Sequence, residues 1–180
     1  FDKLIKDVII SYFPKKNINF TIQHEQKGIS HALMCAKEFV ASGDTVFFIL
    51  GDNFFQFSPI MNIKMNDLIK NRGAYIFSYK VDNPEEFGVA ELDADNNVVS
   101  IEEKPKNPKT NNAVVGVYIY DDSVMEKIKT LKPSARGEYE VTDLNNLYIA
   151  EGTCKNITLS GWWVDAGTPD RILELESKLS

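Results

Sequence analysis

Cysteine and histidine are scarce in this sequence, with two residues of each type among 180. Cys35 and Cys154 lie far apart and match no metal-ligand spacing, which argues against a disulfide framework and favours a reduced, cytoplasmic protein. His24 and His31 have no partner at the spacing of a metal site or a catalytic triad. We therefore assign no chemistry to any of these four side chains.

A basic excess and a long apolar run are also missing. Acidic residues outnumber basic ones by 26 to 20, and this net charge of −6 argues against a protein that binds nucleic acid or membrane surfaces through a basic patch. Small nucleotides stay open as ligands, because a few local donors and a metal ion can hold them. The sequence contains no signal peptide and no membrane-length apolar span. Its length suits a single domain, residues 1–180, with a substantial core.

Strand and helix patterns alternate along the chain. Apolar runs predict strands at residues 18–23, 45–50, 74–81, 88–92, 98–103, 113–120 and 157–160, and apolar residues at helical spacing predict helices at residues 1–12, 28–40, 60–71, 123–131, 141–151 and 168–179. The strands at 88–92 and 98–103 flank a turn-rich segment, which predicts a β-hairpin. This order predicts an α/β fold with a mixed, mostly parallel sheet, helices on both faces and a hairpin insert.

Two aspartates follow apolar stretches at predicted strand ends. Asp52 stands in the sequence LGDNF at residues 50–54, directly after a buried strand, where open α/β sheets bind ligands. Asp165 stands between the apolar residues 162–164 and a glycine turn. Together they would form a two-carboxylate Mg²⁺ site, since this ion is often held by one or two carboxylates plus substrate phosphates. The alternative is ordinary turn chemistry around Asp52, and a helix-end role for Asp165.

Three further segments carry polar side chains that suit a nucleotide or a sugar phosphate. Gln23 and Gly28 frame a loop between a strand and a helix, where the amide can pair with a pyrimidine edge and the glycine lets backbone N–H groups approach a ligand. Glu103 and Lys104 end a predicted strand and could bind a sugar hydroxyl and a phosphate. Arg136 lies in a small-residue loop and suits phosphate recognition. The alternatives are a plain loop, a solvated charge cluster and a surface arginine.

The residues after Arg136 have a simpler interpretation. Glu140, Thr142 and Asp143 surround the start of the predicted helix at residues 141–151. Residues of these types suit helix capping and complement the helix macrodipole. We therefore predict that they stabilise this helix start.

Taken together, these segments resemble the sugar-1-phosphate nucleotidylyltransferases, and most of all the glucose-1-phosphate thymidylyltransferases. The matching stretches follow the family order at residues 23–32, 50–54, 83–89, 101–105, 113–120, 131–143 and 163–168. The resemblance implies a Rossmann-like nucleotidyltransferase fold of the GT-A type. It also implies a magnesium-dependent transferase of nucleotide-sugar and polysaccharide biosynthesis that uses dTTP or UTP and a sugar 1-phosphate, with a homo-oligomer as one expected state.

The resemblance implies a role for each matching residue. Asp52 and Asp165 would hold Mg²⁺, Lys104 and Arg136 would bind the sugar phosphate, and these four form the expected catalytic set. The other matching residues would bind substrate: the base lies against Gln23 and Gly28, and the sugar against Asn53, Gly88, Glu103, Val114 and Tyr118.

The sequence also departs from the family pattern. The family opens with a strand, a Gly-rich loop bearing an arginine and a Lys-Pro segment, and none of these is present. The chain begins without Met, inside an amphipathic helical pattern. We therefore expect a piece of a longer protein, N-terminally incomplete, and predict that these 180 residues alone do not catalyse the transfer.

Several alternatives stay open at this point. A sugar-nucleotide-binding or regulatory protein of the same fold would need no catalytic segment. A related glycosyltransferase is disfavoured, because Gly51, Asp52 and Asn53 replace the expected D-x-D motif. Gln23 favours a pyrimidine over guanine, but the residues do not separate thymidylyl from uridylyl transfer.

Overall fold

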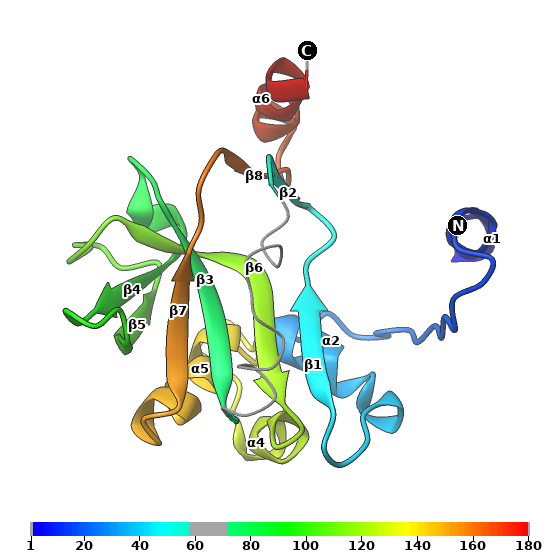
Figure 1. The fold of residues 1–180 in the computed structure, drawn as a ribbon, viewed down its shortest axis with the longest axis horizontal. Helices are drawn as coiled ribbons and strands as arrows, with labels where there is room; N and C mark the ends of the chain where they lie inside the picture. Colours follow the sequence, from blue (N-terminus) through cyan, green and yellow to red (C-terminus); the bar gives the residue numbers. More distant parts are fainter. Residues whose placement is uncertain (1, 58–71, 180) are drawn as a thin grey trace.

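A mixed β-sheet forms the centre of the protein (Figure 1). The computed structural model describes residues 2–57 and 72–179. The six-stranded sheet has the order β5–β4–β6–β3–β7, and β1 pairs with β6 beside this path. Its strands are β1 (Thr45–Ile49), β3 (Ala74–Lys80), β4 (Gly88–Leu92), β5 (Val98–Glu103), β6 (Asn112–Asp121) and β7 (Cys154–Thr158). A separate two-stranded sheet pairs β2 (Asn53–Phe55) with β8 (Trp163–Asp165).

The long strand β6 determines the strand directions. It runs antiparallel to β1, β3 and β4, and β4 runs antiparallel to β5. Among the described strands only β3 and β7 form a parallel pair, so the predicted predominance of parallel pairing is wrong. The reason is that β6 enters the sheet in the reverse direction, between β1 and β3. Those two strands do share one direction, as strands of an α/β sheet do.

Alternate residues of β6 face two different apolar clusters. Tyr118 and Tyr120 are buried with residues of the helices α2 (Ile29–Met34), α4 (Val124–Thr130) and α5 (Val141–Ala150). Val117 and Ile119 are buried instead with Trp163 of β8. Since successive strand residues point to opposite faces, the described helices α2, α4 and α5 cover one face of the sheet. The helix predicted at residues 60–71 lies outside the described residues.

Most predicted elements are present with small shifts at their ends. The hairpin β4–β5 is confirmed, and the loop before it contains the short 3-10 helix η2 (Pro84–Glu86). The predicted helix at residues 28–40 is too long. Ala36 leaves α-helical geometry at φ −96° and ψ 8°, and the chain continues as the 3-10 turn η1 (Lys37–Phe39). The predicted strand at residues 157–160 is displaced toward the N-terminus and forms β7. This strand includes Asn156, a polar residue that is buried in the sheet.

The predicted strand at residues 18–23 is not formed. This segment runs as extended chain between α1 (Asp2–Tyr12) and α2, and no described strand pairs with it (Figure 1). Without a neighbouring strand its backbone groups cannot form a ladder. At the other end of the chain, α6 (Pro169–Leu179) follows β8 directly. Among the described residues, no helix combines the length and the apolar character needed to span a bilayer.

Candidate active site

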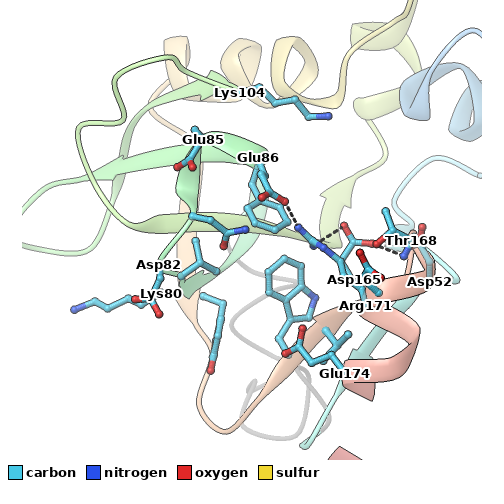
Figure 2. A pocket seen from close by; sticks show the side chains of 18 residues that line it. Asp52, Lys80, Asp82, Glu85, Glu86, Lys104, Asp165, Thr168, Arg171 and Glu174 are labelled. Carbon is cyan, nitrogen blue, oxygen red and sulfur yellow. Dashed lines mark hydrogen bonds and ion pairs between the residues drawn. The ribbon is translucent and has the colours of Figure 1, made fainter. Parts of the chain in front are cut away.

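The small sheet of β2 and β8 brings the two predicted metal-binding aspartates together. Asn53 is the cross-strand partner of Asp165, and the backbone N–H of Ala166 donates to the carbonyl oxygen of Asp52 at 2.7 Å. A methyl group built on Gly167 would lie 3.1 Å from Oδ1 of Asp165 and 3.8 Å from Oδ2 of Asp52. Both carboxylates therefore approach one common region next to Gly167. Figure 2 shows Asp52 and Asp165 side by side.

Each of the two carboxylates is held by neighbouring groups. Nδ2 of Asn53 donates to Oδ1 of Asp52 at 2.8 Å. The backbone N–H of Gly167 donates to Oδ1 of Asp165 at 3.1 Å, and Nη1 of Arg171 lies 3.5 Å from Oδ2 of the same residue. Such outer contacts orient carboxylates that bind a metal ion.

The arrangement fits a magnesium ion that is shared with phosphate groups. No group of three or more His, Cys, Asp or Glu side chains within residues 2–57 and 72–179 could enclose a metal ion. Mg²⁺ does not need such a cage, since one or two carboxylates with waters and substrate phosphates are sufficient. The donor set of Asp52 and Asp165 therefore matches the chemistry of this ion.

A cavity of about 250 Å³ lies next to Asp165. All of the residues predicted to bind the sugar and its phosphate line it, together with the predicted metal ligand Asp165: Asn53, Gly88, Glu103, Lys104, Val114, Tyr118 and Arg136. They come from six separate parts of the chain, so only the tertiary structure places them together. Gln23, Gly28 and Asp52 do not line this cavity.

Glu103 and Lys104 lie at the end of β5, at the cavity wall. Oγ1 of Thr142 donates to Oε2 of Glu103 at 2.8 Å, so Thr142 orients this carboxylate. A methyl group built on Gly88 would lie 3.4 Å from each of these two oxygens, an ordinary van der Waals contact, so Gly88 packs closely beside this pair. Lys104 adopts a left-handed φ of 44°, uncommon for a residue with a side chain and typical of functional sites.

Arg136 is surrounded by carboxylates. Its Nη2 lies 2.9 Å from Glu140, 3.6 Å from Glu103 and 3.9 Å from Glu138, and its Nε also donates to Glu140 at 3.2 Å. The hydrogen bond to Glu140 is the main reason that the pKa of Arg136 is raised. The guanidinium is therefore held in place at the cavity while it stays about half exposed.

The predicted capping role of Glu140 is wrong. Glu140 occupies the N-cap position of α5, but its side chain forms no capping hydrogen bond. Its carboxylate instead accepts from Arg136 and from Oγ of Ser134, the latter at 2.7 Å. Thr142, which binds Glu103, likewise belongs to the cavity wall. Sequence reasoning missed both, because they are common residue types for a helix start.

The loop after Gln23 has a defined geometry of its own. Nε2 of Gln23 donates to the carbonyl oxygen of Gly28 at 3.1 Å and lies 2.9 Å from Nδ1 of His31. Because a carbonyl oxygen only accepts, the amide nitrogen must face Gly28, and Nδ1 of His31 must then accept as well. Within the described residues the amide oxygen of Gln23 accepts no hydrogen bond, so it is available as an acceptor. His31, to which the sequence assigned no chemistry, thus orients Gln23.

Gly28 lies close to the segment that precedes α5. Its φ is 92°, and a side chain there would approach the backbone oxygen of Tyr139 at 2.8 Å. The backbone N–H of Tyr139 in turn donates to the carbonyl oxygen of Lys27 at 2.8 Å. Glycine is therefore required where this loop packs against Tyr139.

A larger cavity, of about 1050 Å³, adjoins the first one (Figure 2). The two share Lys104 and Asp165, as well as Phe87 and Trp163, whose rings lie 5.3 Å apart. Arg171 of α6 packs beside these shared residues. It forms an ion pair with Glu86 and lies 4.7 Å from the centre of the Phe87 ring. None of these contacts could be predicted from the sequence, since α6 and the Phe87 loop are far apart in the chain.

The fold is that of an α/β protein with two adjoining cavities, and comparison with known proteins identifies the family. The chain belongs to the Nucleotidyl transferase family, whose sequence profile matches residues 8–180. The resemblance inferred from the sequence is confirmed.

Several relatives carry the same name. The chain is 39% identical over 160 residues to a glucose-1-phosphate thymidylyltransferase of Mycolicibacterium smegmatis, covering 88% of this chain and 55% of the relative. It is 40% identical over 162 residues to a protein of that name from Neisseria gonorrhoeae, covering 89% of this chain and 56% of the relative. The chain thus spans about half the length of these curated relatives.

Solved structures confirm the predicted fold class. A Bacillus anthracis structure, described as a glucose-1-phosphate thymidylyltransferase in complex with sucrose, matches with a TM-score of 0.84 and 37% identity, over 96% of this chain and 71% of that one. A UDP-glucose pyrophosphorylase with bound UDP-glucose matches with a TM-score of 0.82 at 18% identity, over 99% of this chain and 71% of that one. The second match concerns the fold alone.

Proposed function

We propose that this chain is the sugar-binding part of an enzyme that transfers a nucleotidyl group, dTMP, from a nucleoside triphosphate to glucose 1-phosphate. The products are pyrophosphate and a nucleotide sugar. The observation that carries the proposal is the single cavity that combines Glu103, Lys104 and Arg136 with Asp165. The names of the relatives support the thymidylyl donor and the glucose acceptor.

In the proposed reaction, an oxygen of the sugar phosphate attacks the α-phosphorus of the triphosphate in line with the leaving pyrophosphate. Lys104 and Arg136 bind the sugar phosphate, and Glu103 accepts a hydrogen bond from a sugar hydroxyl. Arg136 is placed for this by Glu140, and Glu103 by Thr142. Catalysis then consists of positioning the two substrates and neutralising their charge.

The proposed cofactor is Mg²⁺, bound by Asp52 and Asp165. When bound, it would neutralise negative charge on phosphate oxygens. Gln23 would bind the base, with its amide oxygen accepting from the N3–H group of thymine or uracil. Both bases carry this group, so Gln23 does not distinguish them. A UTP-dependent enzyme is therefore the second candidate, and a sugar-nucleotide-binding protein without turnover is the third.

Calorimetric titration of this chain with dTDP-glucose, with and without Mg²⁺, tests the proposal. We expect dTDP-glucose to bind more tightly than GDP-mannose, and Glu103→Gln to weaken binding because the carboxylate that Thr142 orients is lost. Glu126→Gln, which changes an exposed carboxylate on α4 outside both cavities, is the matched control. Equal affinity for both nucleotide sugars would contradict the base-reading role of Gln23.

A second assay concerns turnover. We expect no pyrophosphate release from dTTP and glucose 1-phosphate with this chain alone, because it spans 55–56% of the length of its relatives. A longer form of the protein that releases pyrophosphate would support the enzyme. A longer form that binds dTDP-glucose without releasing pyrophosphate would support the non-catalytic alternative.

A further inference from the structure

Asn53 forms three hydrogen bonds that determine the orientation of its amide. Its Oδ1 accepts from the backbone N–H of Gly116 at 2.9 Å and from the indole Nε1–H of Trp163 at 2.8 Å. Both partners can only donate, so the oxygen of the amide must face them and the nitrogen must face Asp52. The Nδ2 donor, 2.8 Å from Oδ1 of Asp52, is therefore assigned by chemistry.

The space that Asn53 occupies exists because residue 116 is a glycine. A methyl group built on Gly116 would lie 2.7 Å from Nδ2 of Asn53 and 2.8 Å from Cδ1 of Leu50. Contacts this short require a neighbour to move. The amide of Asn53 thus lies against the backbone of β6, between β6 and β8.

This arrangement distinguishes the two oxygens of Asp52. Oδ1 accepts from Asn53, whereas Oδ2 lies on the side of Gly167, toward which Oδ1 of Asp165 also points. We infer that Asn53 is a positioning residue that turns Oδ2 of Asp52 toward the cation shared with Asp165. The inference rests on the proposed metal-binding role of the two aspartates and deepens it.

The inference also limits the sugar-binding role expected for Asn53. Two donors occupy its amide oxygen and Asp52 takes one of its two N–H groups. One N–H group is left for a sugar hydroxyl. Asn53 can therefore bind the sugar only as a hydrogen-bond donor, and its main role is to position Asp52.

Binding of Mn²⁺ to this chain, followed by electron paramagnetic resonance of the free ion, tests the inference without any turnover. Asp52→Asn and Asp165→Asn define the site, and each should abolish binding. We expect Asn53→Ala to weaken Mn²⁺ binding roughly 10- to 100-fold, the range found when outer partners of metal ligands are removed. Trp163→Phe keeps an aromatic ring, though a smaller one, and removes the indole N–H donor; it should weaken binding less, in the same direction.

Gly116→Ala separates positioning from loss of a ligand, because it crowds the Asn53 amide while both proposed ligands, Asp52 and Asp165, are kept in the sequence. We expect it to weaken Mn²⁺ binding, and to add no further loss in the Asn53→Ala background. Gly51→Ala is the matched control, since a methyl group on Gly51 meets nothing within 4 Å. Thermal unfolding followed by circular dichroism checks that each variant is folded.

The outcomes separate the inference from the function on which it rests. If Asp52→Asn abolishes binding while Asn53→Ala and Trp163→Phe leave it within twofold of the unchanged chain, the positioning role is refuted and the metal site stands. Full additivity of Gly116→Ala and Asn53→Ala would also refute it. If the unchanged chain binds Mn²⁺ no better than the Asp52→Asn variant, both the metal site and the inference are overturned.

Discussion

Replacing Tyr120 by phenylalanine should destabilise the protein through a single buried hydrogen bond. Tyr120 of β6 is fully buried, and its hydroxyl donates to Oδ1 of Asn145 on α5 at 2.8 Å. Burial raises the pKa of Tyr120 well above its usual range, so the hydroxyl stays protonated and keeps donating at any ordinary pH. Nδ2 of Asn145 has no hydrogen-bond partner within the described part of the chain, which makes Tyr120 important for this amide.

The size of the effect follows from what the substitution leaves behind. Tyr120→Phe keeps the ring, which stacks on Tyr148 at 5.6 Å between centroids, and removes only the oxygen. The buried amide oxygen of Asn145 then has no donor among residues 2–57 and 72–179, a loss that typically costs about 1–3 kcal/mol. For a protein of this size, that corresponds to a decrease in melting temperature of about 2–12 °C.

Urea denaturation followed by circular dichroism measures this free energy of unfolding. Tyr79→Phe is the control: its hydroxyl donates to the carbonyl of Gly161 at 2.9 Å in an exposed position, and its removal should change stability by less than about 0.5 kcal/mol. The double variant Tyr120→Phe/Asn145→Leu should recover part of the loss, because it removes both partners. A Tyr120→Phe variant as stable as Tyr79→Phe would refute the reasoning.

Three further predictions concern the core, the cysteines and the base loop. Leu144→Ala, at a fully buried position, should cost about 2–5 kcal/mol in urea denaturation, whereas Leu173→Ala, at a position 63% exposed, should cost less than about 0.5 kcal/mol; equal losses would contradict the packing of α5. Iodoacetamide should label Cys35 before Cys154 at pH 8, as read by mass spectrometry, because burial raises the pKa of the Cys154 thiol to about 12; faster labelling of Cys154 would be inconsistent with its burial. Gly28→Ala should weaken dTDP-glucose binding in calorimetry, because a side chain at φ 92° meets the backbone of Tyr139; unchanged affinity would place the base elsewhere.

Local sequence patterns predicted those elements whose apolar residues repeat at one clear period. The run TVFFI forms β1, and the two strands around the Asp-Asn turn form the β4–β5 hairpin. Such patterns failed to predict a strand where a polar side chain is buried in the sheet. Asn156 is buried in β7 because its side chain donates to Thr158 and to Asn96, so polar residues hid the strand from a hydrophobicity pattern.

The candidate site was predictable to a similar extent. Residue type and position at predicted strand ends made Asp52, Asp165, Glu103 and Lys104 candidates, and the resemblance to a known family then implied their roles. Arg171 could not be selected, since an arginine in an exposed helix pattern has no distinctive signal. Its contact with Asp165 depends on where α6 begins after β8.

The sequence by itself determined the kinds of elements, their order and the chemistry available, because side-chain periodicity and composition act over a few neighbouring residues. Only the tertiary structure determined which strands pair and which side chains contact one another. The reverse direction of β6 and the pairing of β2 with β8 bring Asp52, Asn53 and Asp165 together across more than a hundred residues of chain. Which oxygen of Asp52 accepts from Asn53, and which atom of Gln23 donates to Gly28, are set by hydrogen bonds that only the folded structure shows.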